Sequence, residues 1–180
     1  MEYLNGKTWG QITREERLFC AELYNELKID KKPFLDKYHF NSSQKYEIGY
    51  EVCFYRDVLK EYELKGFGEL FNQKRTFDLV LFSNNEIHIF EAKSQQGFNS
   101  NQLNKFNDVE KIKELFEKIN QEKNINLIIP KIKLWAIIST MYKPKEETRN
   151  IFENNIVYWR DIYNLYKNEL FKRANEIYNN

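Results

Sequence analysis

The sequence predicts a single α/β domain over residues 1–180, in which helices flank a central mixed sheet of four to five strands. Its 180 residues are 42% hydrophobic and 16% aromatic, which is enough to fill one sizeable core. Segments with helical periodicity alternate with short runs rich in β-branched and aromatic residues. The predicted order is therefore helix, helix, strand, strand, helix, strand, strand, helix.

Two helices are expected within residues 1–66. Thr13-Arg14-Glu15-Glu16 has the spacing of a capping box, and apolar residues follow at four-residue intervals, which predicts a helix over 13–28. Lys31-Lys32-Pro33 should end this helix. A second helix should begin at the possible caps Ser42 and Ser43 and run toward residues 66–68. Its apolar stripe would consist of Ile48, Val52, Tyr55 and Leu59.

A β-hairpin is expected next. Thr76–Phe82 and Ile87–Lys93 are rich in apolar and aromatic residues and flank Asn84 and Asn85, which tolerate the positive φ of a tight turn. With these two residues as the turn, pairing begins at Ser83 and continues outward.

The rest of the chain predicts one helix, two strands and a final helix. Helical spacing returns from Ser100 and lasts until residues 123–124. The near-continuous apolar run Leu134–Thr140 fits a buried strand, and Ile156–Trp159 resembles another. Asp161 then caps a last helix that runs through Ile177.

Composition excludes several classes of protein. No apolar run approaches the roughly 20 residues that cross a bilayer, and the first residues start no signal peptide, so we expect a cytoplasmic protein without a membrane partner. Cys20 and Cys53 can neither build a disulfide framework nor complete a zinc site, so both should be reduced core thiols. The net charge of +1 neither indicates nor excludes a nucleic-acid partner.

Two carboxylates should face each other in the hairpin. The turn places Asp78 directly opposite Glu91, and strand alternation puts Glu91 and Lys93 on the same side. Like charges in this position destabilise a sheet and resist burial, so a compensating cation is expected. Mg²⁺ takes one or two protein carboxylates and keeps several waters, while a neighbouring Lys can position or deprotonate a water or neutralise charge on a phosphate. A solvated strand face would also explain the pattern.

The expected second helix carries a further acid. Glu51 lies between Ile48 and Tyr55, at the edge of the apolar stripe, where a half-buried carboxylate needs a reason. Glu47, one turn earlier, fits as well. Gly49 costs about 1 kcal/mol relative to Ala in a helix interior, and close approach of another backbone would account for it.

Several polar residues near the hairpin are candidate substrate contacts. Gln102 should face inward at the start of the following helix, where its amide could bind a phosphate or a metal-bound water. Lys105 and Arg75 could bind phosphates, and the loop Ser94–Asn99, which includes Gln96, could touch a substrate strand. A solvated surface explains these residues equally well.

Together, Glu51, Asp78, Glu91-Ala92-Lys93 and Gln102–Phe106 resemble the PD-(D/E)XK nuclease superfamily, which has the restriction-endonuclease-like fold. The resemblance covers roughly residues 43–140, the expected catalytic core. It implies that Glu51, Asp78 and Glu91 hold one or two Mg²⁺ ions and that Lys93 assists the attacking water. Gln102–Phe106 is similar to the Q-x-x-x-(Y/F) element of some branches of the superfamily. Phe77 stands where the name-giving Pro would be.

The resulting hypothesis is a Mg²⁺-dependent nuclease that acts on DNA, with Mn²⁺ able to substitute. Asp78, Glu91, Lys93, Glu51 and Gln102 would be its catalytic residues. The alternative is a catalytically silent nucleic-acid-binding or interaction module, belonging to a defence or repair complex, with the same fold. A homodimer is plausible because cutting both strands of a duplex usually requires two active sites.

Overall fold

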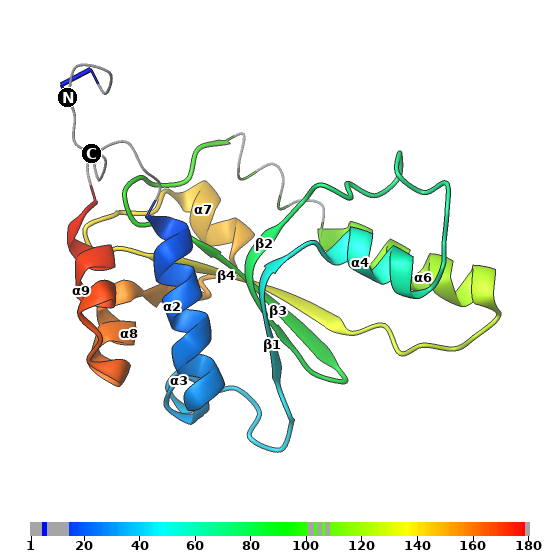
Figure 1. Ribbon diagram of the computed structural model, residues 1–180, viewed down its shortest axis with the longest axis horizontal. Helices are drawn as coiled ribbons and strands as arrows, with labels where there is room; N and C mark the ends of the chain where they lie inside the picture. Colours follow the sequence, from blue (N-terminus) through cyan, green and yellow to red (C-terminus); the bar gives the residue numbers. More distant parts are fainter. Residues whose placement is uncertain (1–4, 7–14, 101–102, 104–105, 107–108, 179–180) are drawn as a thin grey trace.

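A five-stranded mixed sheet forms the centre of the fold (Figure 1). The computed structural model describes residues 5–6, 15–100, 103, 106 and 109–178. The strands lie in the order β1-β2-β3-β4-β5. Strand β2 pairs antiparallel with β1 and with β3, and β4 pairs parallel with β3 and with β5. The predicted mixed sheet is thus confirmed. The strands are β1 (Glu47–Val52), β2 (Phe77–Phe82), β3 (Glu86–Ala92), β4 (Lys131–Ile138) and β5 (Ile156–Tyr158).

Helices cover both faces of the sheet (Figure 1). Alternating strand residues such as Leu79 and Val80 enter two different cores, as the two-residue period of a strand requires. In the described part of the chain, the helices that pack on the Leu79 face are α2 (Glu16–Ile29), α3 (Lys32–Lys37), α8 (Trp159–Tyr166) and α9 (Glu169–Glu176). Those that pack on the Val80 face are α4 (Phe54–Glu61) and α6 (Val109–Lys123). The short helix α7 (Glu146–Ile151) lies between β4 and β5 in the chain.

The predicted second helix is wrong over its first half, because residues 47–52 form strand β1. Ile48, Tyr50 and Val52 alternate with small or charged residues, a two-residue period that the helical interpretation overlooked. Gly49 fits this strand because a Cβ there would lie 2.5 Å from Val52 Cγ2 and 3.1 Å from the Phe82 ring. Only the second half of the prediction is helical, as α4.

The hairpin has the predicted register. Leu79 pairs with Phe90 and Phe82 pairs with Ile87, so Asn84 and Asn85 lie at the turn. The Ser83 N–H donates to the Glu86 carbonyl oxygen at 2.9 Å and closes the turn. Extending this register by one pair places Asp78 opposite Glu91.

The other helices differ from prediction mainly at their ends. The described part of the first helix begins at Glu16, and Thr13 of the expected capping box lies outside the described residues. Lys32-Pro33 begins the short helix α3, since Pro is well suited to a first helical turn. The single expected C-terminal helix is two helices, because Lys167 adopts a left-handed φ of 56° and Asn168 caps α9 through Leu170 N–H.

Both cysteines are free, but only Cys20 is the predicted core thiol, because Cys53 is only partly buried. Among the described residues, no helix is long and apolar enough to span a bilayer.

A Gly49→Ala substitution distinguishes the strand from the helix by the sign of its effect. In β1 the added methyl group overpacks against Val52 and Phe82, so we expect the free energy of unfolding to fall by about 1–3 kcal/mol. In a helix the same change would raise it by about 1 kcal/mol. Urea denaturation measures the difference. Gly68→Ala, where the nearest atom is the flexible Gln73 amide at 3.3 Å, is the control and should change stability little.

Candidate active site

The candidate site lies where β2 begins and β3 ends, beside the first turn of α2. Asp78 is the second residue of β2, and Glu91 is the penultimate residue of β3. The Ala92 N–H donates to Asp78 Oδ2 at 2.9 Å, which ties the two strands together at this point. The second Asp78 oxygen is not used in that hydrogen bond.

Lys93 follows β3 and points back to Glu91, as strand alternation predicted. Its Nζ lies 3.7 Å from Glu91 Oε1, and the Lys93 residue is only 8% exposed. A cation this deeply buried requires anionic partners, because removing an ammonium from water is costly.

Glu16, in the first turn of α2, is the acid that the sequence analysis missed. Its Oε2 lies 3.6 Å from Lys93 Nζ, and its Oε1 accepts a hydrogen bond from Ser94 N–H at 3.3 Å. The sequence signal was present, but the Thr13-x-x-Glu16 spacing was explained as a capping box. In the structure, the Glu16 side chain reaches across to the end of β3.

The backbone of Lys93 is fixed by two neighbouring elements. Its N–H donates to the Ile137 carbonyl of β4 at 2.8 Å, and its carbonyl accepts from the Trp159 indole N–H at 3.1 Å. Trp159 is fully buried, with its ring against those of Phe19 and Phe171. The ammonium therefore projects from a rigid base.

Burial and mutual repulsion make the carboxylates hard to ionise. Burial, assisted by the charge of Asp78, raises the pKa of Glu91 to about 8, although Lys93 and Arg75 oppose the shift. Burial also raises the pKa of Asp78, against the opposing effects of the Ala92 N–H and Lys93. Glu91 and Glu16 thus lie within 4 Å of Lys93 Nζ, and Asp78 adds its charge, so the site has excess negative charge when all three acids are ionised.

Lys93 remains a cation. Burial alone would lower its pKa, but Glu91, Glu16 and Asp78 outweigh that effect, and the pKa is raised above its ordinary value. In this environment Lys93 is suited to neutralising negative charge and to donating hydrogen bonds, and unsuited to removing a proton from water at neutral pH.

Glu51 is not on a helix, contrary to the prediction. It lies near the end of β1, where the register continues to a position beside Asp78, and its charge contributes to the raised pKa of Asp78. Its backbone has a left-handed φ of 50°, and its carboxylate pairs with Arg17 Nε at 3.3 Å. Glu51 therefore borders the cluster, with its charge already paired.

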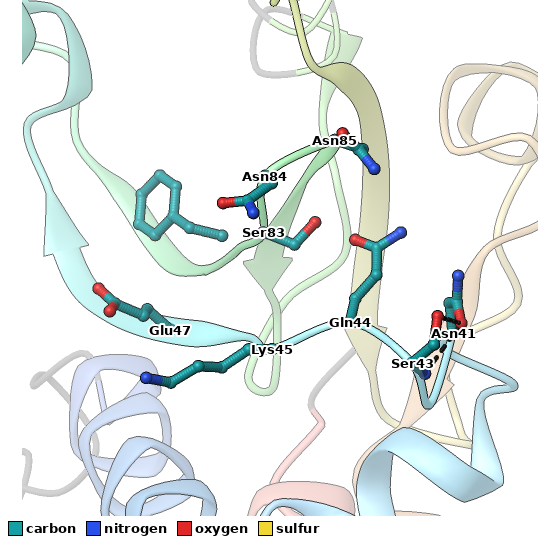
Figure 2. Close-up of a pocket in the computed structure, with 9 residues that line it drawn as sticks. Asn41, Ser43, Gln44, Lys45, Glu47, Ser83, Asn84 and Asn85 are labelled. Carbon is teal, nitrogen blue, oxygen red and sulfur yellow. Dashed lines mark hydrogen bonds between the residues drawn. The ribbon is translucent and has the colours of Figure 1, made fainter.

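Glu47 lies at the other end of β1, across from Phe82. There it lines a polar cavity of about 720 Å³ together with the hairpin turn residues Ser83, Asn84 and Asn85 (Figure 2). Because Asp78 is near the opposite end of the same strand pair, Glu47 does not belong to the acidic cluster.

The predicted substrate contacts have mixed outcomes. Gln102 and Lys105 lie outside the described residues. Arg75 packs over the Phe77 and Phe106 rings, with its guanidinium carbon 4.9 and 5.3 Å from their centroids, and its charge lowers the pKa of Glu91. Gln96 is exposed in the loop after Lys93. Arg75 is thus close enough to influence the cluster electrostatically.

The oxygen ligands present suit a hard divalent cation. Among the described residues, no three His, Cys, Asp or Glu side chains converge closely enough to hold an ion. Mg²⁺, however, commonly uses only one or two protein carboxylates and retains water for its other positions. Asp78 and Glu91 form such a pair, and the excess negative charge around Lys93 would be relieved by a cation.

Comparison of the chain with protein-family models, curated protein sequences and solved structures gives no match. Function must therefore be inferred from the chemistry of the residues themselves.

The raised pKa of Glu91 predicts how stability depends on pH without metal. Since the folded protein holds this proton more tightly than the unfolded chain, stability should fall as pH rises from about 4.5 to about 8. Glu91→Gln removes the free-energy cost of ionising this buried carboxylate. In EDTA it should therefore raise the melting temperature by roughly 5–10 °C at pH 8.5 and much less at pH 5.

Differential scanning calorimetry at both pH values tests this expectation. Glu47→Gln, an exposed acid at the other end of β1, is the matched control and should leave the pH profile unchanged. If Glu91→Gln changed the melting temperature equally at both pH values, the raised pKa of Glu91 would be contradicted.

Proposed function

We propose that this protein is a metal-dependent nuclease that hydrolyses phosphodiester bonds, with DNA as its substrate. The observation that carries the proposal is the grouping of Asp78, Glu91 and Glu16 around the buried Lys93. Two of these carboxylates, Asp78 and Glu91, have raised pKa values, and perturbed pKa values cluster at catalytic sites. The same residues carry the resemblance to PD-(D/E)XK nucleases, with Glu16 from α2 as the helix acid in place of Glu51.

Asp78 and Glu91 are the proposed ligands of one Mg²⁺ ion, which Mn²⁺ could replace. A divalent cation bound there would lower the pKa of a water molecule and neutralise charge on the phosphate. Glu16, whose Oε2 lies 3.6 Å from Lys93 Nζ, is proposed to hold the Lys93 ammonium in position. Deprotonation of Glu91, which costs free energy in the free protein, would be favoured by the bound cation.

Lys93 is proposed to stabilise charge that develops during hydrolysis. Its ammonium is buried, protonated and held on a fixed backbone, so it can donate to a non-bridging phosphate oxygen without reorganising. Arg75 could make a second contact with the phosphate backbone, where positive side chains add affinity without reading sequence.

A nuclease assay with Mg²⁺ or Mn²⁺ on plasmid and oligonucleotide DNA tests the proposal. Lys93→Met keeps the length of the stem but removes the charge, so the cleavage rate should fall by roughly a hundredfold or more while DNA binding changes less. Lys45→Met, at the other end of the sheet, is the matched control and should cleave normally. Failure of the wild type to cleave any substrate would support a silent binding module with this fold.

Comparing the cleavage rates of two variants shows whether Glu16 or Glu51 acts together with Asp78 and Glu91. Glu16→Gln should reduce the cleavage rate at least tenfold, because Glu16 contacts Lys93, whereas Glu51→Gln should reduce it by a smaller factor, because Glu51 is paired with Arg17. Rates measured at saturating Mn²⁺ and with matched melting temperatures separate this effect from instability. A larger loss of cleavage rate in Glu51→Gln than in Glu16→Gln would assign the role of third acid to Glu51.

A further inference from the structure

A groove of about 460 Å³ lies next to the candidate active site. It is formed by the loops that follow β3 and β4 and by the C-terminal segment, and its lining includes Phe98, Tyr142, Lys143, Lys145 and Tyr178. Phe98 joins the groove to the catalytic cluster, since its ring centroid is 5.7 Å from Lys93 Nζ.

Three aromatic rings line this groove. The Tyr142 and Tyr178 ring centroids are 5.6 Å apart, and those of Phe98 and Tyr142 are 6.4 Å apart. All three side chains are only partly buried, so ring surface is accessible to a ligand. Aromatic faces of this kind stack nucleic-acid bases, with little dependence on base identity.

The Tyr142 ring is held in position. Its hydroxyl accepts a hydrogen bond from Phe98 N–H at 3.3 Å, and its ring lies so close to Gly97 that a Cβ there would be 2.3 Å from it. Thr140 N–H, two residues earlier, donates to Asn175 Oδ1 at 2.8 Å and ties the loop to α9. A fixed ring loses little freedom when a ligand stacks on it.

The groove also carries positive charge. Lys143 and Lys145 are exposed and line it, and none of the described residues that line it is acidic. Glu146 and Glu147 follow in α7 but do not contribute to the lining. Ammonium groups beside a row of rings suit a strand whose phosphates and unstacked bases are both accessible.

We infer that this groove binds single-stranded DNA and delivers it to the catalytic cluster, so that the substrate has an unpaired strand beside the scissile phosphate. The inference rests on the proposed function for its cleavage step, but the binding step stands separately. In an intact duplex the bases are stacked on one another and unavailable to Tyr142. The groove therefore discriminates between unpaired and paired DNA.

Fluorescence anisotropy tests the binding step, with Ca²⁺ present to suppress cleavage. The probes are a labelled oligodeoxythymidine of about 12 nucleotides and a blunt duplex of the same length. We expect the wild type to bind the single strand at least tenfold more tightly than the duplex. Tyr142→Leu should lose most of that preference, with about a tenfold weaker affinity for the single strand, whereas Tyr142→Phe should keep it.

A variant that removes surface charge tests the groove independently, in case Tyr142→Leu misfolds. Lys143 and Lys145 are exposed, so the double variant Lys143→Ala/Lys145→Ala should fold normally and weaken the binding of single strands, with a shallower dependence on salt by one to two phosphate contacts' worth. Lys45→Ala, in the distant polar cavity, is the matched control.

The outcomes separate this inference from the proposed function. Equal affinity for single strand and duplex, or unchanged binding by both groove variants, would overturn the groove assignment even if Asp78-dependent cleavage is observed. Strand-selective binding that depends on Tyr142, without cleavage by the wild type, would support the groove and contradict the nuclease.

Discussion

The site is organised around one buried ammonium group, which two carboxylates contact and a third influences through its charge. Lys93 can be buried only because Glu91 and Glu16 lie within 4 Å of its Nζ, and the carboxylates tolerate their own burial partly because Lys93 is there. Lys93 does not fully compensate the carboxylates, since the pKa of Glu91 is still raised to about 8 and the pKa of Asp78 is also raised. Carboxylates that ionise less readily in the folded protein than in the unfolded chain lower its stability as the pH rises, and catalytic sites are where this cost is commonly found.

The fold brings this cluster together from elements that are distant in sequence. The tight turn sets the register that places Asp78 opposite Glu91, and Trp159, near the other end of the chain, holds the Lys93 carbonyl. Because β3 and β4 are parallel, their carboxyl ends lie at the same end of the sheet, so the loops that follow them lie side by side. That shared end of the sheet places the aromatic and basic groove next to the carboxylates. The polar cavity lined by Glu47 and the hairpin turn (Figure 2) lies at the other end of β1 and β2.

Local sequence signals predict some parts of the structure well and other parts wrongly. The hairpin followed from a turn dipeptide and strand alternation, both of which are encoded within about ten residues, and with it came the relation of Asp78, Glu91 and Lys93. Strand β1 was mistaken for a helix because Ile48 and Val52 satisfy a helical spacing as well as a strand period. Glu16 joins the cluster only through the tertiary packing of α2, which no local pattern encodes. The groove is formed by three segments that are far apart in the sequence, so no local pattern predicts it either.

Mn²⁺ binding measured by isothermal titration calorimetry tests the central claim most directly, namely that the cluster is a cation site whose carboxylates are strained without metal. Titrations at pH 7 in two buffers of different ionisation enthalpy report the protons released. Saturable binding that releases about one proton, and that Asp78→Asn abolishes, is the predicted result, because Glu91 with a pKa of about 8 must deprotonate to bind the ion. Absence of saturable binding, or binding unaffected by both Asp78→Asn and Glu91→Gln, would contradict the account.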